Sequence, residues 1–190
     1  MKKQTLIVLM LAASVSVYAQ SSWSIDRAHS KVGFSVTHMV VSETEGIFKD
    51  YNGTVVSKSE DFSGAEVSFA AKAASISTDN ESRDNHLKSA DFFDAEKFPE
   101  ISFKGNIVKD GSKYKLVGDF TMKGVTKKVE FDLVYGGQIN TGRGMKAGFK
   151  INGTVNRQDF GLTWAKTAPG GELVVSNDVA LSIKIELNKA

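Results

Sequence analysis

The feature that most constrains this chain is an alternation of apolar and polar side chains that begins near residue 23. Apolar residues stand at every second position, for example at Val32, Phe34 and Val36. Because successive side chains of a β-strand point to opposite faces of a sheet, this period of two predicts strands with one buried and one solvated face. Amphipathic helices, whose apolar residues recur every three to four positions, do not produce it.

The alternating stretches are separated by short turn sequences. Residues 109–112 and 123–126 contain glycine among polar residues, as hairpin connections do. Roughly eight strands follow one another without the helices that a parallel sheet requires. The sequence therefore predicts an all-β fold in which antiparallel strands form one barrel or sandwich domain.

The N-terminus predicts export from the cytoplasm. Two lysines precede a mostly apolar stretch, residues 6–17, and Val17 and Ala19 place small side chains at the two positions that a signal peptidase inspects. This is the arrangement of a cleaved signal peptide, so we expect residues 1–19 to be removed between Ala19 and Gln20. The apolar stretch is shorter than the roughly 20 residues that span a bilayer. We therefore expect residues 20–190 to be a periplasmic domain without an integral membrane segment.

Composition excludes several kinds of partner and site. The absence of cysteine excludes disulfides, thiolate metal sites and a cysteine nucleophile. Two of the 24 lysines and arginines lie in the expected signal peptide, which leaves 22 against 22 aspartates and glutamates. Because the basic residues are also dispersed along the chain, we expect no nucleic-acid partner and no strong attraction to anionic lipid surfaces.

One segment interrupts the alternation. Residues 83–94 read RDNHLKSADFFD and contain the densest group of polar side chains in the chain. Thr78 and Glu81, just before them, have the spacing of a helix capping box. A short helix is therefore expected over residues 79–88, with a further turn that ends near residue 93. Such an excursion in one connection of a barrel is well placed to cover a barrel end.

The inward-facing positions leave the nature of the interior open. They combine aromatic rings with small residues, namely Ala71, Ala73, Ala147, Gly118 and Gly153. A barrel of about eight strands either fills its interior with side chains or keeps room for one ligand. The alternation is compatible with both a packed core and an apolar tunnel.

Several segments, in order, resemble the YceI-like polyisoprenoid-binding family. The resemblance runs from about residue 22 to residue 187 and rests on residues 23–26, 29–39, 46–48, 83–87, 91–94, 98–103, 120–127 and 157–162. It implies an eight-stranded antiparallel, lipocalin-like barrel whose apolar interior holds a long isoprenoid or similar lipid tail. It also implies periplasmic or secreted placement, with some relatives dimeric, so a homodimer is left open. The family has no established catalytic residues, and we expect no cofactor, no metal and no enzymatic activity.

Alternation and position give a list of candidate ligand-binding residues. We predict that the apolar cavity is lined by Phe34, Val36, Phe69, Ala71, Phe92, Phe93, Phe103, Phe120, Phe131, Leu133, Phe149, Ile151, Phe160, Trp164, Leu181 and Ile183. For Phe160 and Trp164, a purely structural role at the barrel end is an equal alternative. Polar residues that could contact a headgroup or lie at the rim are His38, Arg83, His86 and Arg157, since a guanidinium binds phosphate well.

Three other functions compete with lipid binding. His86 could form an acid–base pair with Asp84, Asp91 or Asp94 in a hydrolase, although Asp84 is two residues from His86 on the expected helix and so does not face it. The three histidines, His29, His38 and His86, could converge on a metal, although their spacing in the sequence is not that of a metal-binding motif. A ligand-free interaction or stress-response module is the last alternative.

Overall fold

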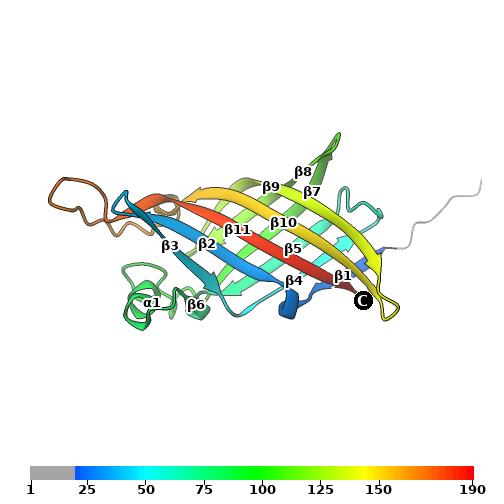
Figure 1. Ribbon diagram of the computed structural model, residues 1–190, viewed down its shortest axis with the longest axis horizontal. Coiled ribbons are helices and arrows are strands. Elements are labelled where there is room, and N and C mark those ends of the chain that lie inside the picture. Colours follow the sequence, from blue (N-terminus) through cyan, green and yellow to red (C-terminus); the bar gives the residue numbers. More distant parts are fainter. Residues whose placement is uncertain (1–19) are drawn as a thin grey trace, which may run out of the picture.

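The alternating segments form antiparallel strands that close into an eight-stranded barrel, as predicted (Figure 1). The computed structural model describes residues 20–190. The expected signal peptide, residues 1–19, and its cleavage site lie outside the described residues and stay predictions. No helix in the described part of the chain has the length and hydrophobicity needed to cross a bilayer.

Each of the first three barrel strands consists of two shorter strands, and the last five are continuous. The pairs are β1 (Ser21–Ile25) with β2 (Lys31–His38), β3 (Ser42–Phe48) with β4 (Tyr51–Ser57), and β5 (Glu66–Lys72) with β6 (Ile76–Ser77). The continuous strands are β7 (Glu100–Asp110), β8 (Lys113–Met122), β9 (Val125–Asn140), β10 (Met145–Asn156) and β11 (Val175–Lys189). Each barrel strand pairs with its neighbours in the chain, and β11 closes the ring on β1 and β2.

The three breaks lie side by side in the sheet. The first is the 3-10 turn η1 (Arg27–His29), the second lies between β3 and β4, and the third is the 3-10 turn η2 (Ala73–Ser75). Hydrogen bonds join them, from the Arg27 guanidinium to the carbonyl of Lys49 at 2.9 Å and from the Lys49 amide to the carbonyl of Ser75 at 3.1 Å.

Every break changes which residue numbers face the barrel interior. Odd-numbered side chains such as Ile25 point inward on β1, but even-numbered ones such as Phe34 point inward on β2. The inward residues are even-numbered on β3, as at Phe48, and odd-numbered on β4, as at Val55. They are odd-numbered on β5, as at Phe69, and even-numbered on β6, where Ile76 is buried. The simple alternation expected from the sequence is thus reset three times.

The barrel wall is open between β6 and β7, and the connection of residues 78–99 covers this opening (Figure 1). It contains α1 (Glu81–Lys88), which confirms the expected short helix, and turns follow at residues 90–93. The expected capping box was wrong. Asn80, not Thr78, caps the helix by accepting from the Arg83 amide at 3.0 Å. The buried Thr78 hydroxyl is instead engaged by Asp84, at 2.6 Å.

The opposite end of the barrel is sealed by aromatic packing. Phe62, in the connection between β4 and β5, is 1% exposed. Its ring centroid lies 5.1 Å from that of Trp23, 5.4 Å from Tyr135 and 5.0 Å from Phe149. Tilted and edge-on rings at these separations pack favourably. Space for a ligand is therefore confined to the middle of the barrel and the end near α1.

Two glycines that could have left room for a ligand receive phenylalanine rings instead. A Cβ on Gly153 would lie 2.3 Å from the ring of Phe131. One on Gly118 would lie 2.3 Å from the backbone carbonyl oxygen of Lys104 and 2.8 Å from the ring of Phe103. The rings lie where side chains would otherwise stand, so these glycines serve packing and add no cavity space.

Gly153→Ala is therefore expected to lower the free energy of unfolding by about 1–3 kcal/mol, the usual cost of forcing an extra carbon into a packed core. Urea denaturation followed by circular dichroism measures this change. Gly148→Ala is the matched control, because Gly148 lies on the same strand and an added Cβ there meets nothing within 4 Å. Equal stabilities of the two variants would contradict the packing account.

Candidate functional site

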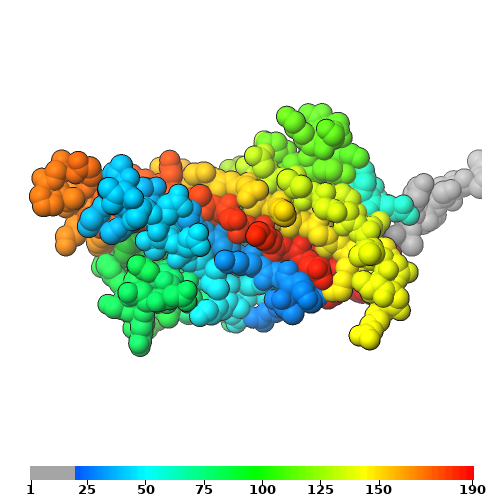
Figure 2. All heavy atoms as spheres, viewed as in Figure 1, coloured from blue at the N-terminus to red at the C-terminus, as the bar shows by residue number. Residues whose placement is uncertain are grey.

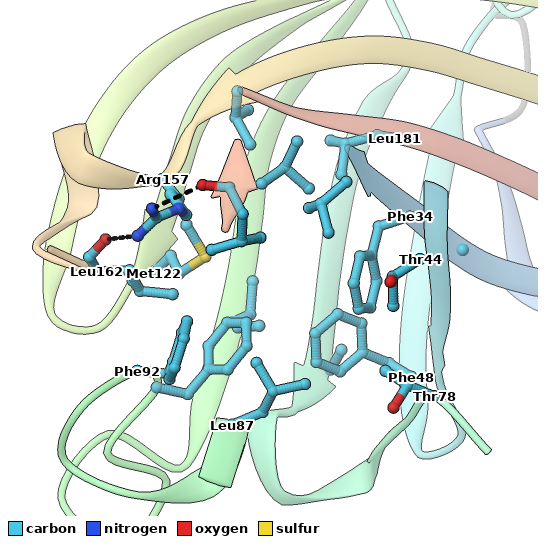
Figure 3. A pocket seen from close by; sticks show the side chains of 18 of the residues that line it. Phe34, Thr44, Phe48, Thr78, Leu87, Phe92, Met122, Arg157, Leu162 and Leu181 are labelled. Atoms are coloured by element: carbon cyan, nitrogen blue, oxygen red, sulfur yellow. Dashed lines mark hydrogen bonds between the residues drawn. The ribbon is translucent and has the colours of Figure 1, made fainter. Parts of the chain in front are cut away.

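The candidate site is an apolar cavity of about 280 Å³ at the barrel end near α1 (Figure 3). Phe34, Phe48 and Leu181 approach it from the barrel wall, and Leu87 and Phe92 approach it from the covering connection. Its remaining walls are also mostly apolar and come from β5, β7, β8, β10 and the segment before β11. The cavity reaches the surface beside His86, whose side chain lines it and is 44% exposed.

A second cavity of about 100 Å³ adjoins the first deeper in the barrel. The two share four lining residues, Phe69, Phe120, Leu181 and Ile183. Side chains of the smaller cavity are otherwise nearly all apolar, and the sealed end lies beyond them. The interior is therefore hollow over part of its length, which decides between the packed core and the tunnel that the sequence left open.

Fifteen of the sixteen side chains that the sequence placed in the lining border one of the two cavities. The larger cavity is bordered by Phe34, Val36, Phe69, Ala71, Phe92, Phe93, Phe120, Trp164, Leu181 and Ile183. The smaller one is bordered by Phe103, Phe131, Leu133, Phe149 and Ile151 as well as the shared residues. Phe160 borders neither: it is 2% exposed and packs edge-on against Phe120 at 5.4 Å. Whether these residues contact a ligand stays a prediction.

Sequence reasoning missed other lining residues, for reasons that differ. Phe48 and Met122 stand at inward positions of β3 and β8, so the alternation could have found them. Leu87 is the apolar residue of a polar helix, which was also a usable signal. Leu162 lies in irregular backbone, where no periodicity predicts the direction of a side chain.

Aromatic contacts attach the covering connection to the barrel. The ring centroid of Phe93 lies 5.9 Å from that of Phe48, and Phe92 lies 5.2 Å from Trp164. Polar contacts hold the first residues of this connection in place. Arg83 donates from Nε to the Thr78 hydroxyl at 2.7 Å and from Nη2 to the Thr78 carbonyl at 2.8 Å. Arg83 lines the cavity mouth, but these two donors are used locally.

Arg157 is a buried cation in the wall of the larger cavity (Figure 3). Its side chain is only 3% exposed, and burial lowers its pKa. All five of its N–H donors have protein acceptors, namely the carbonyls of Leu162, Trp164, Val175 and Ser176 and the side-chain oxygen of Asn177. The guanidinium thus joins the segment before β11 to β11 itself. A headgroup would have to displace one of these bonds to reach an N–H group of Arg157.

His86 pairs with Asp91, one of the three aspartates considered as its partner. The distance from Nε2 to Oδ2 is 2.9 Å, and both side chains are largely exposed. Asp84 is occupied by Thr78. The His86 ring also packs edge-on against Phe92 and Trp164, at 5.0 and 5.7 Å. This arrangement suits a side chain that borders the cavity mouth.

The three histidines do not converge. His38 and His86 line the larger cavity, whereas His29 lines neither cavity and contacts Asp26 at 3.0 Å. Asp26, His29 and Glu186 lie close enough for a metal, but the ammonium of Lys146 stands among them, 2.7 Å from Asp26 and 2.6 Å from Glu186. That ammonium holds the pKa of Asp26 well below its usual range. The cluster therefore already contains its cation.

Residues 23–187 match the sequence model of the YceI-like domain. UPF0312 protein SAS2572 of Staphylococcus aureus (strain MSSA476) is 34% identical over 170 residues, which cover 88% of this chain and 98% of that protein. The crystal structure of a Campylobacter jejuni YceI protein is also 34% identical, with a TM-score of 0.67 over 86% of this chain and 95% of that one. A polyisoprenoid binding domain from Saccharophagus degradans shares the fold at 12% identity, with a TM-score of 0.65 over 88% and 98% of the two chains.

Proposed function

This chain belongs to the YceI-like family, and we propose that it is a non-catalytic protein that binds the apolar tail of a lipid inside its barrel. The proposed ligand is a long-chain polyisoprenoid of the quinone or prenyl-phosphate type, or a related lipid. The observation that carries this proposal is the pair of adjoining apolar cavities. A solved polyisoprenoid binding domain with the same fold agrees with this ligand class.

The size of the cavities favours a slender tail over a compact ligand. The larger cavity, about 280 Å³, is at the low end of the roughly 300–1,000 Å³ of small-molecule sites. A long chain gains further space by passing Phe69 and Phe120 into the second cavity. Each buried methylene contributes about 0.8 kcal/mol, so a prenyl unit gains on the order of 3 kcal/mol before ordering costs are subtracted.

The headgroup in this proposal stays at the mouth. His38, Arg83 and His86 border the larger cavity where it meets the surface, and the deeper cavity offers almost no polar surface. Selection should therefore depend on tail length more than on headgroup chemistry. The expected signal peptide supports a periplasmic location, where such a lipid would be held outside the cytoplasm.

Extraction of purified protein tests this function. Native mass spectrometry and solvent extraction should find a long-tailed lipid, close to one molecule per protein. A ligand-free interaction module predicts no lipid even after the protein is incubated with one. An enzyme instead predicts chemical change of the lipid that is lost in His86→Ala, whereas a binding protein returns the lipid unaltered in both forms.

A further inference from the structure

Three consecutive apolar side chains are exposed at the tip of the hairpin that joins β2 to β3. Met39, Val40 and Val41 are 42%, 70% and 86% exposed. Other large apolar side chains that the structure shows exposed stand singly, at Val108, Val125, Val134 and Ile139. A contiguous exposed apolar tip is unfavourable in water, and contact with an apolar partner relieves it.

The backbone of this tip is strained. Met39 and Val40 have φ angles of 48° and 65°, in the left-handed region that side chains, and β-branched ones above all, avoid. The Val41 amide donates to the carbonyl of His38 at 3.2 Å, which closes a turn that favours asparagine and glycine at its two central positions. Ordinary turn residues would stabilise the hairpin better, so the apolar residues point to a function of the tip.

The tip lies at the rim of the larger cavity. His38 precedes the tip, Thr44 follows it on β3, and both line the cavity. The Met39 amide donates to the carbonyl of Val174 at 3.1 Å, and Val174 is a lining residue too. Figure 2 shows the hairpin and the segment before β11 (orange) projecting at the same end of the molecule. The exposed apolar tip is thus next to the apolar wall of the cavity.

The size and charge of the tip favour a lipid surface as its partner. Stable protein interfaces bury about 800 Å² on each side, far more than three side chains provide. No charged residue lies between His38 and Ser42. The flanking segments carry charges of both signs, Glu43 and Glu45 on β3 and Lys166 and Glu172 before β11. A bilayer accepts a small neutral tip because its chains deform around the inserted side chains.

We propose that residues 39–41 form a membrane-docking tip, which inserts into a bilayer surface while the protein loads or releases its lipid. This inference rests on the proposed function, because docking shortens the path of an apolar tail through water between bilayer and cavity. The contact is weak and reversible, since even a myristoyl chain gives only marginal membrane binding. It is also nearly independent of salt, since the tip carries no charge.

A turn-optimised variant, Met39→Asn/Val40→Gly/Val41→Ser, separates docking from stability. Asparagine and glycine adopt the left-handed conformation readily, so this variant is expected to unfold at an equal or higher urea concentration than the wild type. Transfer of a radiolabelled polyprenol from phosphatidylcholine vesicles to the protein is expected to slow by about tenfold or more. The control Val134→Ser/Ile139→Ser removes two exposed apolar side chains from β9 and should leave the transfer rate unchanged.

Delivery of the same polyprenol from ethanol, without vesicles, distinguishes the two proposals. Slow transfer from vesicles together with normal uptake from ethanol supports the docking tip. Equal vesicle transfer by the wild type and the tip variant overturns docking and leaves lipid binding intact. If the wild type takes up no polyprenol from either source, the proposed function fails and docking loses its basis. Self-association of the wild type that the tip variant loses would assign the tip to a second copy of the chain and also overturn docking.

Discussion

Ala71→Trp is expected to empty the barrel of lipid. Ala71 lies on β5, lines the larger cavity and stands between Tyr51 and Ile101 on the neighbouring strands. An indole in place of the methyl group would extend into the space proposed for the lipid tail. We expect the lipid recovered per protein to fall by at least about tenfold, the consequence of losing a few buried methylenes or more. Native mass spectrometry of the purified variant measures this ratio.

Ala70→Trp is the matched control. Ala70 is the adjacent residue of the same strand, and its side chain points to the opposite face of the sheet. The control therefore adds the same indole outside the cavity, and its lipid content should equal that of the wild type. Both variants should keep the circular dichroism of a β-protein. Full lipid content in folded Ala71→Trp would place the ligand outside the barrel. Ala147→Trp would be a poor plug, because Ala147 borders neither cavity.

Arg157→Met is expected to destabilise the protein by about 3–5 kcal/mol. Methionine fills much of the same space but leaves four buried or half-buried carbonyls without their donor. Hydrogen bonds to a charged group are worth about 1.5–3 kcal/mol each in favourable cases, and unpaired buried acceptors add a further cost. Urea denaturation measures the loss, and Arg143→Met, in the exposed turn between β9 and β10, should change stability by less than about 0.5 kcal/mol.

Arg157→Lys separates charge from geometry. Lysine keeps the positive charge but has three donors on one nitrogen, which cannot reach acceptors that surround a planar guanidinium. We therefore expect Arg157→Lys to lose most of the stability that Arg157→Met loses. A lysine variant as stable as the wild type would show that the charge alone holds the segment before β11, contrary to the hydrogen-bond account.

The barrel could be predicted from the sequence because its strands obey a local rule. The alternation at Val32, Phe34 and Val36 fixes which side chains face inward wherever a strand is continuous. The three breaks could not be predicted in this way, because they depend on hydrogen bonds between segments far apart in the chain, such as the one from Arg27 to Lys49. Helix α1 was predicted, but its cap was not: Asn80 caps the first turn, while the Thr78 hydroxyl donates to Asp84.

The sequence predicts which residues face the barrel interior, but not which of them border a cavity. Inward residues such as Phe69 and Phe120 follow from alternation, yet nothing in the pattern separates a ring that borders a cavity from one that fills a gap. Phe131 illustrates the difficulty, since its ring covers Gly153 while also bordering the smaller cavity. Arg157 was selected as a rim residue, and only the fold brings together the acceptors that bury it.

The three aligned breaks also bear on how such a barrel can diverge between relatives. A one-residue slip within a continuous strand would turn every following side chain to the other face. At η1 and η2 the inward-facing positions change between odd and even residue numbers. The register of β2, β3 and β6 near the mouth is therefore independent of the register of β1, β4 and β5 near the sealed end. In this part of the wall, insertions and substitutions near the mouth can therefore accumulate without turning side chains at the sealed end. The continuous strands β7 to β11 lack this freedom, so variation between relatives should concentrate on the mouth side of the three breaks.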